Sequence, residues 1–281
     1  MRASFVGSEE HKELFCRLFV DTHLPFEVAN LKWPELEPAA LARLKGLPIW
    51  TEAVNTELET GLKVKALGDA EPDLVLAEAI KLNGYEEQRH FELLLALTKN
   101  YGIPITRRPD PAPVRDPLWA FTGVGFAECF DSFFAFGIFH VAERSGFFPK
   151  SLIDLFEPVM QEEARHILFF VNWAAYRKQK APAYLRPAHT FENGLAASLQ
   201  VVNRLKMAVA AGDEDGVDEN FMMNTHAAFG NISAREFVHI CLSESERRMS
   251  RYDTRLLRPR IAPTAARLIL RFLKDEKKAV S

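Results

Sequence analysis

Two copies of one five-residue pattern carry the side chains best suited to chemistry in this sequence. The first copy reads Glu-Glu-Gln-Arg-His over residues 86–90, and the second reads Glu-Glu-Ala-Arg-His over residues 162–166. Carboxylates and imidazoles are metal ligands, and residues three positions apart are neighbours on one face of a helix. The repeat therefore predicts two helices that each offer a Glu-x-x-His pair to a shared metal site.

The spacing of apolar residues indicates which side chains of each copy point inward. Around the first copy, one helix face carries Ile80, Gly84, Glu87, Phe91, Leu94 and Thr98. Around the second copy, the matching face carries Phe156, Val159, Glu163, His166, Phe170 and Trp173. Such a stripe faces the core of a helical protein. The expected inward ligands are therefore Glu87, His90, Glu163 and His166.

The other acid and the arginine of each copy fall beside this stripe. Glu86 precedes Arg89 by three residues, and Glu162 precedes Arg165 by three. This spacing favours ion pairs along a single helix. We expect these pairs to flank the ligands, either in solvent or in a second layer around the metal.

A buried carboxylate needs a charge partner, so a shared metal site calls for acids on two further helices. In the preceding helix, Glu57 lies near the middle of the apolar face. Glu52 is the alternative, because it stands 76 residues before Glu128, which is also the offset of the repeat. In the helix before the second copy, Glu128 is the expected acid and Asp131 is the alternative.

The charge and type of these ligands indicate which metals they would hold. Four carboxylates and two neutral imidazoles carry a formal charge of −4, which two divalent cations would cancel. Oxygen and imidazole ligands suit iron, with manganese as the alternative, whereas thiolates favour zinc. The isolated Cys16, Cys129 and Cys241 form no CxxC pair, which excludes a rubredoxin-type centre and is typical of a reducing compartment.

The six expected ligands resemble the ligand set of the ferritin-like carboxylate-bridged di-iron proteins: Glu57, Glu87, His90, Glu128, Glu163 and His166. The resemblance covers about residues 48–179. It implies two iron ions bridged by carboxylates. It often also implies activation of dioxygen or peroxide.

Proline clusters separate the elements that must position these ligands. Residues 104–117 and 181–187 are rich in proline, which removes backbone donors and disfavours helix. The intervening segments are rich in good helix formers, and few period-two strand patterns occur, so an all-α fold is expected. The expected helices cover about residues 48–67, 72–100, 117–145 and 150–179.

These helices form two hairpins joined by a long connection. About 16 extended residues at roughly 3.1 Å each span some 50 Å, whereas a helix of about 28 residues is about 42 Å long. The connection can therefore return along the bundle, as in the ferritin-like variant of the four-helix bundle. We expect one domain overall, in which an N-terminal helical extension (1–47) and C-terminal helices (180–281) pack on the bundle (48–179).

The remaining candidate ligands have structural interpretations. Glu236 and His239 form a third Glu-x-x-His pair, but Ser233 begins a Ser-Ala-Arg-Glu capping box at a helix start. The other histidines have no companions spaced as ligands, so we expect structural or surface roles for His11, His23, His140, His189 and His226.

Charge and hydropathy bear on location and partners. Eleven Lys and Arg residues lie between Arg247 and Lys278, although the net charge of the chain is −3. This basic tail is expected to be a solvated helix or a cover for acidic surface, and it leaves nucleic acid as an alternative partner. No signal core and no run of about 18 uncharged apolar residues occurs, which predicts a cytoplasmic protein with no transmembrane segment.

These expectations lead to a di-iron oxidoreductase that activates dioxygen to hydroxylate or otherwise oxidise a small organic substrate. Electrons would come from an external donor, because the chain has no nicotinamide or flavin fingerprint. A homodimer is compatible with this reading. The alternatives are a ferroxidase or iron-handling protein and, given the basic tail, a tRNA-modifying hydroxylase.

Overall fold

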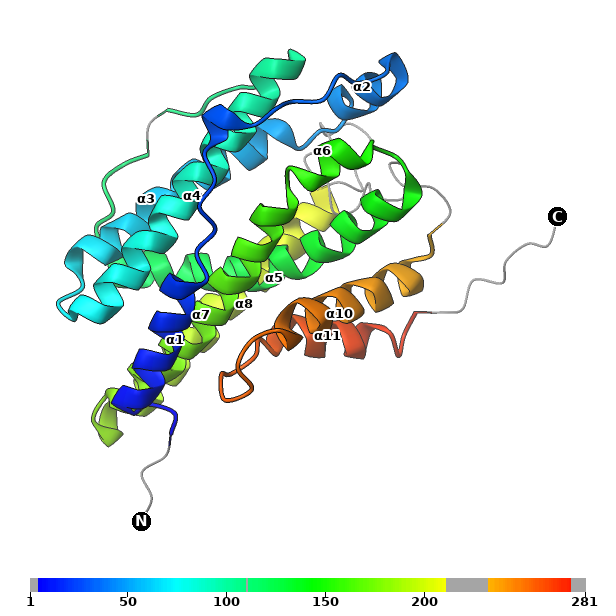
Figure 1. Ribbon diagram of the computed structural model, residues 1–281. Coiled ribbons are helices and arrows are strands. Elements are labelled where there is room, and N and C mark those ends of the chain that lie inside the picture. The colour runs from blue at the N-terminus through cyan, green and yellow to red at the C-terminus, as the bar shows by residue number, and fades with distance from the viewer. Residues whose placement is uncertain (1–4, 110, 211–231, 274–281) are drawn as a thin grey trace.

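The segments between the proline clusters are helices in the computed structural model, which describes residues 5–109, 111–210 and 232–273. Within these ranges there is no strand, so the expected all-helical fold is confirmed for the described residues. Four long helices position the expected ligands (Figure 1): α3 (Trp50–Ala70), α4 (Leu74–Tyr101), α5 (Pro117–Ser145) and α7 (Glu157–Lys180).

Local signals set the ends of these helices. Asp73 caps α4 by accepting hydrogen bonds from the backbone N–H groups of Val75 and Leu76. Gly102 ends α4 with a φ of 61°, a left-handed conformation that glycine adopts without strain. The expected fourth helix is interrupted, because α6 (Lys150–Asp154) precedes α7. Pro158 explains the break, since its ring would clash with the carbonyl of residue 154 in a continuous helix.

The long helices pack as two hairpins. α3 lies along α4 and α5 lies along α7, and contacts between α3 and α5 and between α4 and α7 join the two pairs. The connection between α4 and α5 returns along the outside of α3 (Figure 1). Asn55 on α3 holds it there, because its amide bonds the carbonyl of Thr106 and the N–H of Arg108.

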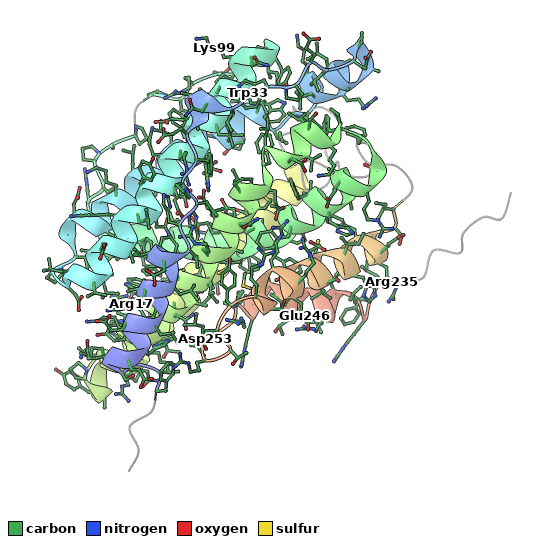
Figure 2. The ribbon with its side chains drawn as sticks, viewed as in Figure 1. Arg17, Trp33, Lys99, Arg235, Glu246 and Asp253 are labelled. Atoms are coloured by element: carbon green, nitrogen blue, oxygen red, sulfur yellow. The ribbon has the colours of Figure 1, made fainter. Side chains whose placement is uncertain are left out.

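The N-terminal segment covers the face formed by α4 and α7. Helix α1 (Glu9–Asp21) packs on both of these helices. The chain then runs lengthwise past the short helical turn η1 (Val28–Asn30) to α2 (Pro38–Lys45). Figure 2 shows Arg17 of α1 towards one end of the molecule and Trp33 towards the other, near Lys99 of α4. This segment therefore spans the level at which the two sequence copies lie.

The C-terminal helices cover α5. After the turn η2 (Ala183–Leu185), α8 (Arg186–Ala210) and α10 (Ala234–Ser250) each contact both α5 and α7. Helix α11 (Ile261–Ile269) contacts α5 and α10. Basic residues continue from α10 towards α11, and the end of the expected basic tail, residues 274–281, lies outside the described residues.

Helix α5 is apolar nearly all round because other helices surround it. Among the described helices, it is the one long and apolar enough to cross a membrane, and 61% of its most apolar window is buried inside the protein. A core helix of this length passes the same test. Its composition therefore agrees with its central position.

A belt of buried polar residues crosses the middle of the bundle. One apolar cluster on one side of the belt includes Val64 and Ile80, and another cluster on the opposite side includes Trp50 and Leu97. Between these levels, α4 and α7 bury Glu86, Glu87, Arg89, His90, Glu162, Arg165 and His166. Burying so many charged groups is costly unless they are paired, so their partners define the site.

Candidate metal centre

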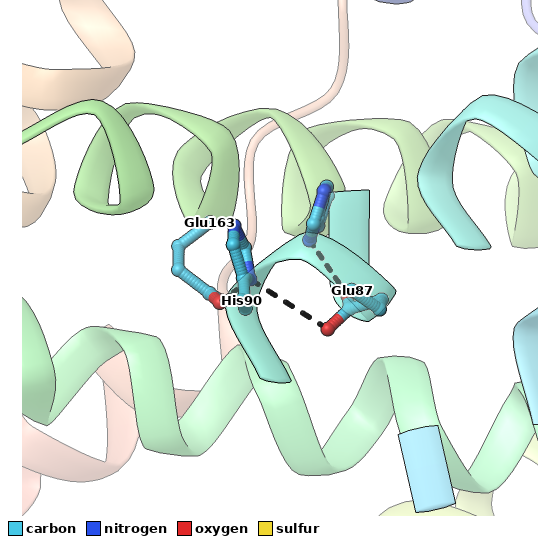
Figure 3. Close-up of side chains that lie close together, drawn as sticks. Glu87, His90 and Glu163 are labelled. Atoms are coloured by element: carbon cyan, nitrogen blue, oxygen red, sulfur yellow. Dashed lines mark ion pairs between the residues drawn. The ribbon is translucent and has the colours of Figure 1, made fainter. Parts of the chain in front are cut away.

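The two sequence copies meet where α4 and α7 pack against each other. One ligand atom from each of Glu87, His90, Glu163 and His166 can be chosen so that all four lie within 4.8 Å of one another. His90 and His166 are 1% and 0% exposed. Figure 3 shows Glu87, His90 and Glu163 converging from the two helices. The structure thus contains a buried Glu/His cluster that could hold a metal ion.

The inward imidazole nitrogens face carboxylates of the opposite helix. His166 Nδ1 lies 2.8 Å from Glu87 Oε1, and His90 Nδ1 lies 3.4 Å from Glu163 Oε1. His90 Nδ1 also lies 3.8 Å from Glu87 Oε2 of its own helix (Figure 3). Each Glu-x-x-His pair therefore shares its space with the pair from the other copy.

The outward imidazole nitrogens are held by the first acid of each copy, Glu86 or Glu162. His90 Nε2 lies 2.9 Å from Glu162 Oε2, and His166 Nε2 lies 2.8 Å from Glu86 Oε2. A carboxylate accepts this hydrogen bond, so the proton belongs on Nε2. In the neutral imidazole, the Nδ1 lone pair then points into the cluster, which is the usual arrangement of metal-binding histidines.

The arginines of the repeat pair between helices, which corrects the expected pairing along one helix. Arg89 of α4 donates to Glu162 of α7, and Arg165 of α7 lies 2.8 Å from Glu86 of α4. Both arginines are nearly fully buried. The pairs are therefore not solvated. A buried guanidinium is stable only when a carboxylate is well placed to pair with it. Here the packing of α4 on α7 places the carboxylate of the other copy in that position.

The first-helix acid beside the cluster is Glu57. Its Oε2 lies 3.8 Å from His90 Nδ1, and its side chain is 22% exposed. Glu52, the alternative, turns to the outside of α3 and pairs with Arg108 of the long connection. The phase of the apolar face therefore identifies the inward acid better than the shared 76-residue offset does.

The third-helix acid lies next to the same cluster. Glu128 Oε1 is buried without a hydrogen-bond partner, whereas the alternative Asp131 is exposed. Glu128 lies outside the group of four residues that converge within 4.8 Å. One turn further along α5, Ser132 Oγ donates a 2.8 Å hydrogen bond to Glu163 Oε2. Helix α5 thus contributes an acid and a hydroxyl to this side of the cluster.

The electrostatics of the cluster favour added positive charge. Burial and the charge of Glu87 raise the pKa of Glu57 and of Glu128 well above the ordinary value of 4.5. Burial alone would lower the pKa of His90 and His166. Hydrogen bonds to Glu162 and Glu86 and the charges of nearby glutamates outweigh it and raise both values well above 6.5.

The second layer behaves in the opposite way. Burial would raise the pKa of Glu86, but the hydrogen bond and charge of His166 and the charge of Arg165 outweigh it and lower the value to about 2. The pKa of Glu163, an acid of the cluster itself, is also lowered, because contact with His90 and the charges of both imidazoles outweigh its burial. Glu86 is therefore ionised at neutral pH and accepts the hydrogen bond from His166 Nε2.

Unpartnered buried atoms test whether these residues fit a metal. Eight buried side-chain nitrogen or oxygen atoms of the described residues lack a hydrogen-bond partner. Half of them belong to the cluster or to Glu128 beside it: Glu87 Oε1, His90 Nδ1, Glu128 Oε1 and His166 Nδ1, of which Glu87 Oε1 and His166 Nδ1 face each other at 2.8 Å. Each such atom costs about 1–3 kcal/mol when left unsatisfied. Bound cations would satisfy all four, so the donor set fits a metal centre of oxygen and imidazole ligands.

The thiols of the described chain do not contribute to this centre. Cys16, Cys129 and Cys241 are buried and free. Burial raises the pKa of each thiol, to about 12 for Cys241, so all three remain protonated at neutral pH. Protonated thiols are poor metal ligands. The ligand atoms that the described cluster offers are therefore carboxylate oxygens and imidazole nitrogens.

Two histidines with structural interpretations lie in different surroundings. Ser233 caps α10 by accepting a hydrogen bond from Glu236 N, and Glu236 and His239 are exposed, which confirms the structural reading of this third pair. His23, for which a structural or surface role is expected, is partly exposed, and its Nδ1 lies 2.6 Å from Glu86 Oε1 beside the cluster. No local spacing in the sequence signals this contact, because 63 residues separate the two partners.

Comparisons with protein-family models, curated protein sequences and solved structures found no match for this chain. The function is therefore inferred from the residues and geometry of the buried cluster.

Proposed function

We propose that this protein is a ferritin-like di-iron oxidoreductase that activates dioxygen to hydroxylate or otherwise oxidise an organic molecule. The observation that carries the proposal is the set of unpartnered imidazole and carboxylate atoms that converge in the core. Its main support from the fold is that four helices each direct at least one acid to the same level of the molecule. Carboxylate-rich helical sites of this kind suit two metal ions.

The proposed ligands are Glu57, Glu87, His90, Glu128, Glu163 and His166. They would hold two iron ions, with manganese as the alternative. Bound iron would supply the redox chemistry with dioxygen, while the chain supplies binding, orientation and charge. The four carboxylates balance two divalent cations, and Glu162 and Glu86 keep the imidazole protons on Nε2 so that each Nδ1 remains available.

The exposure of the acids indicates the side from which a substrate would approach. Glu86 and Glu162 are 0% exposed, so the face of the cluster towards α1 is closed. Glu57 and Glu163 are 22% and 13% exposed, so some solvent reaches the cluster at these two acids. A small molecule would reach the metals beside Glu57 and Glu163. Apolar clusters on both sides of the polar belt would limit water elsewhere.

Metal analysis tests the proposal directly. Protein produced in iron-supplemented medium should contain about two metal ions per chain. Glu163→Ala combined with His166→Ala should abolish binding, because one acid and one imidazole are lost together. Glu236→Ala combined with His239→Ala is the matched control, since this Glu-x-x-His pair is exposed on α10. A folded, metal-free wild-type protein would refute the metal centre.

The proposed oxidase activity needs a separate measurement. Reduced, iron-loaded protein would be incubated with a cell extract and ¹⁸O-labelled dioxygen, and metabolites that gain the label would be identified by mass spectrometry. The Glu163→Ala/His166→Ala protein is the negative control. The iron-storage alternative would instead give a hollow assembly of roughly 24 chains on a sizing column and no labelled metabolite.

A further inference from the structure

His23 links the buried metal cluster to the protein surface. It lies just after α1, and its Nδ1 is 2.6 Å from Glu86 Oε1. Glu86 is fully buried, whereas the His23 side chain is 25% exposed. Glu86 already accepts hydrogen bonds from Arg165 and His166, so His23 Nδ1–H is the donor in this contact. A continuous path of hydrogen bonds therefore runs from His23 through Glu86 to His166.

The two halves of the repeat differ at this point. Glu86 accepts hydrogen bonds from His166, Arg165 and His23. Glu162 accepts from His90 and Arg89, and among the described residues no histidine outside the repeat bonds it. Among the described residues, Glu86 behind His166 therefore has an additional imidazole donor that Glu162 lacks.

A separate metal site at this position is not supported. Ligand atoms of His23, Glu86 and Glu162 do lie within 4.8 Å of one another. However, each carboxylate already binds a buried guanidinium, from Arg165 and Arg89 respectively. A further cation would lie next to two fixed positive charges. The His23 contact is therefore better explained by an effect on Glu86.

Contacts with residues on both sides of His23 in the chain hold it in place. Arg165 donates to Thr22 Oγ1 at 2.9 Å and to the carbonyl of Phe19. Arg89 donates to the carbonyls of Leu24 and Phe26 at 2.8 and 3.0 Å. The segment 19–26 is thus bound to both buried arginines of the repeat. These contacts fix the backbone on either side of His23, so its ring is held next to Glu86.

We infer that His23 is a positioning residue that acts through Glu86 on His166 and makes the two metal positions inequivalent. This inference rests on the proposed di-metal function. The hydrogen bond from His23 orients Glu86 and draws charge from it, which sets how strongly Glu86 accepts the His166 Nε2 proton. Residues that hydrogen-bond a metal-binding histidine directly, as Glu86 would, typically change metal affinity by about 10- to 100-fold, and His23, which contacts Glu86 rather than His166, is expected at the lower end of that range.

Mössbauer spectroscopy of protein loaded anaerobically with ⁵⁷Fe²⁺ tests this inference. The wild type should bind two irons that give two quadrupole doublets of equal area. His23→Leu removes the donor, so it should shift one doublet and leave the other unchanged. The affinity for one of the two irons should fall by about 10-fold. His23→Asn should restore the wild-type spectrum, because its amide N–H can take the place of Nδ1–H.

His140→Leu is the matched control. His140 is also 25% exposed and also pairs with a buried acid, Glu244, at 3.1 Å, but it lies at the α5–α10 contact. The Mössbauer spectrum of the His140→Leu protein should equal that of the wild type. If His23→Leu does not fold, His23→Gln, which moves the donor away from the Nδ1 position, is compared with His23→Asn in its place.

The outcomes separate the two proposals. A wild-type protein that binds no iron would overturn the di-metal function and this inference together. Two bound irons with a single wild-type doublet, or a His23→Leu spectrum unchanged or changed equally at both irons, would overturn only the role of His23. A shift at one iron that His23→Asn reverses would support it.

Discussion

Each copy of the repeated pattern serves both halves of the cluster. The inner acid and the histidine of one copy face the cluster, while its outer acid and arginine hold residues of the other copy. Each of the four residues that the two copies share therefore has a partner across the α4–α7 contact. This exchange explains why the two copies are nearly identical: a change in one half leaves a buried charge in the other without its partner.

Removing one outer charge tests this exchange. Glu162→Gln leaves Arg89, which is 4% exposed, without a counter-charge. Breaking a buried pair costs about 3–5 kcal/mol, so the free energy of unfolding measured with urea should fall by about that amount. Glu92→Gln is the control, because Glu92 is exposed on the same helix. An equal effect of both changes would contradict a special role for the buried pair.

The cluster should make the stability of the metal-free protein fall as pH rises. The folded-state pKa values of His90 and His166 are raised, so their contribution is complete below about 6.5 and is lost at higher pH. Glu57 and Glu128 also bind protons more tightly when folded, so their ionisation acts in the same direction. Glu86 acts oppositely, and its contribution is lost only as pH falls from 4.5 towards 2.

Urea unfolding of metal-free protein between pH 6.5 and 9 measures this effect. The midpoint should decrease across the range, and saturating Mn²⁺ should reduce the slope because the metal replaces the bound protons. Combining Glu57→Gln with Glu128→Gln should also reduce the slope. A flat profile for the metal-free wild type would show that the cluster holds no excess protons.

Helix α5 depends on close packing as well as on its apolar character. At Gly125, an added Cβ would lie 2.0 Å from the ring of Phe170 on α7. At Gly123, two residues earlier, the nearest atom would be 4.0 Å away, on the flexible side chain of Gln200. Of these two glycines of α5, only Gly125 is required by a close contact. Gly125 allows α5 and α7 to approach, which brings Glu128 and Ser132 to the cluster.

Alanine substitutions distinguish these glycines. Gly125→Ala should lower the free energy of unfolding by about 1–2 kcal/mol, because overpacking outweighs the gain in helix propensity. Gly123→Ala should raise it by about 0.5–1 kcal/mol, because propensity acts without a clash. Chemical denaturation of both variants measures the difference. Equal changes would contradict the close contact at Gly125.

In the whole molecule, the cluster joins elements that are distant in the chain. Its side chains come from α3, α4, α5 and α7, and the segment after α1 covers one side. The C-terminal helices enclose α5 from outside. Occupation of the cluster should therefore stabilise the entire bundle rather than one helix.

Metal should raise the thermal midpoint of unfolding. A ligand that binds only the folded state at 100 times its Kd adds about 2.7 kcal/mol of stability. Adding Mn²⁺ or, anaerobically, Fe²⁺ to metal-free protein should give a clear upward shift in a calorimetric scan. The Glu163→Ala/His166→Ala protein should show none, and the Glu236→Ala/His239→Ala protein should respond like the wild type. A shift of equal size in the first variant would place the metal elsewhere.

The features that were predictable from the sequence arise from local rules. Proline positions and helix-forming segments predicted the long helices, except for the break that Pro158 causes between α6 and α7. Helical periodicity predicted that Glu87, His90, Glu163 and His166 share inward faces, because residues three or four apart stay neighbours wherever the helix packs. The same rule favoured Glu57 over Glu52. The link between the cluster and a di-iron oxidase stays a prediction.

The remaining features depend on how helices meet, which no local spacing encodes. The outer Glu and Arg of each copy are suited to pair along their own helix, yet each pairs with the other copy because the α4–α7 contact buries them face to face. His23 reaches Glu86 only because the segment after α1 runs across that contact. The side chains able to bind a metal follow from helical phase. Their second layer follows from tertiary packing, since only the folded chain removes these charges from water and makes each one require a specific partner.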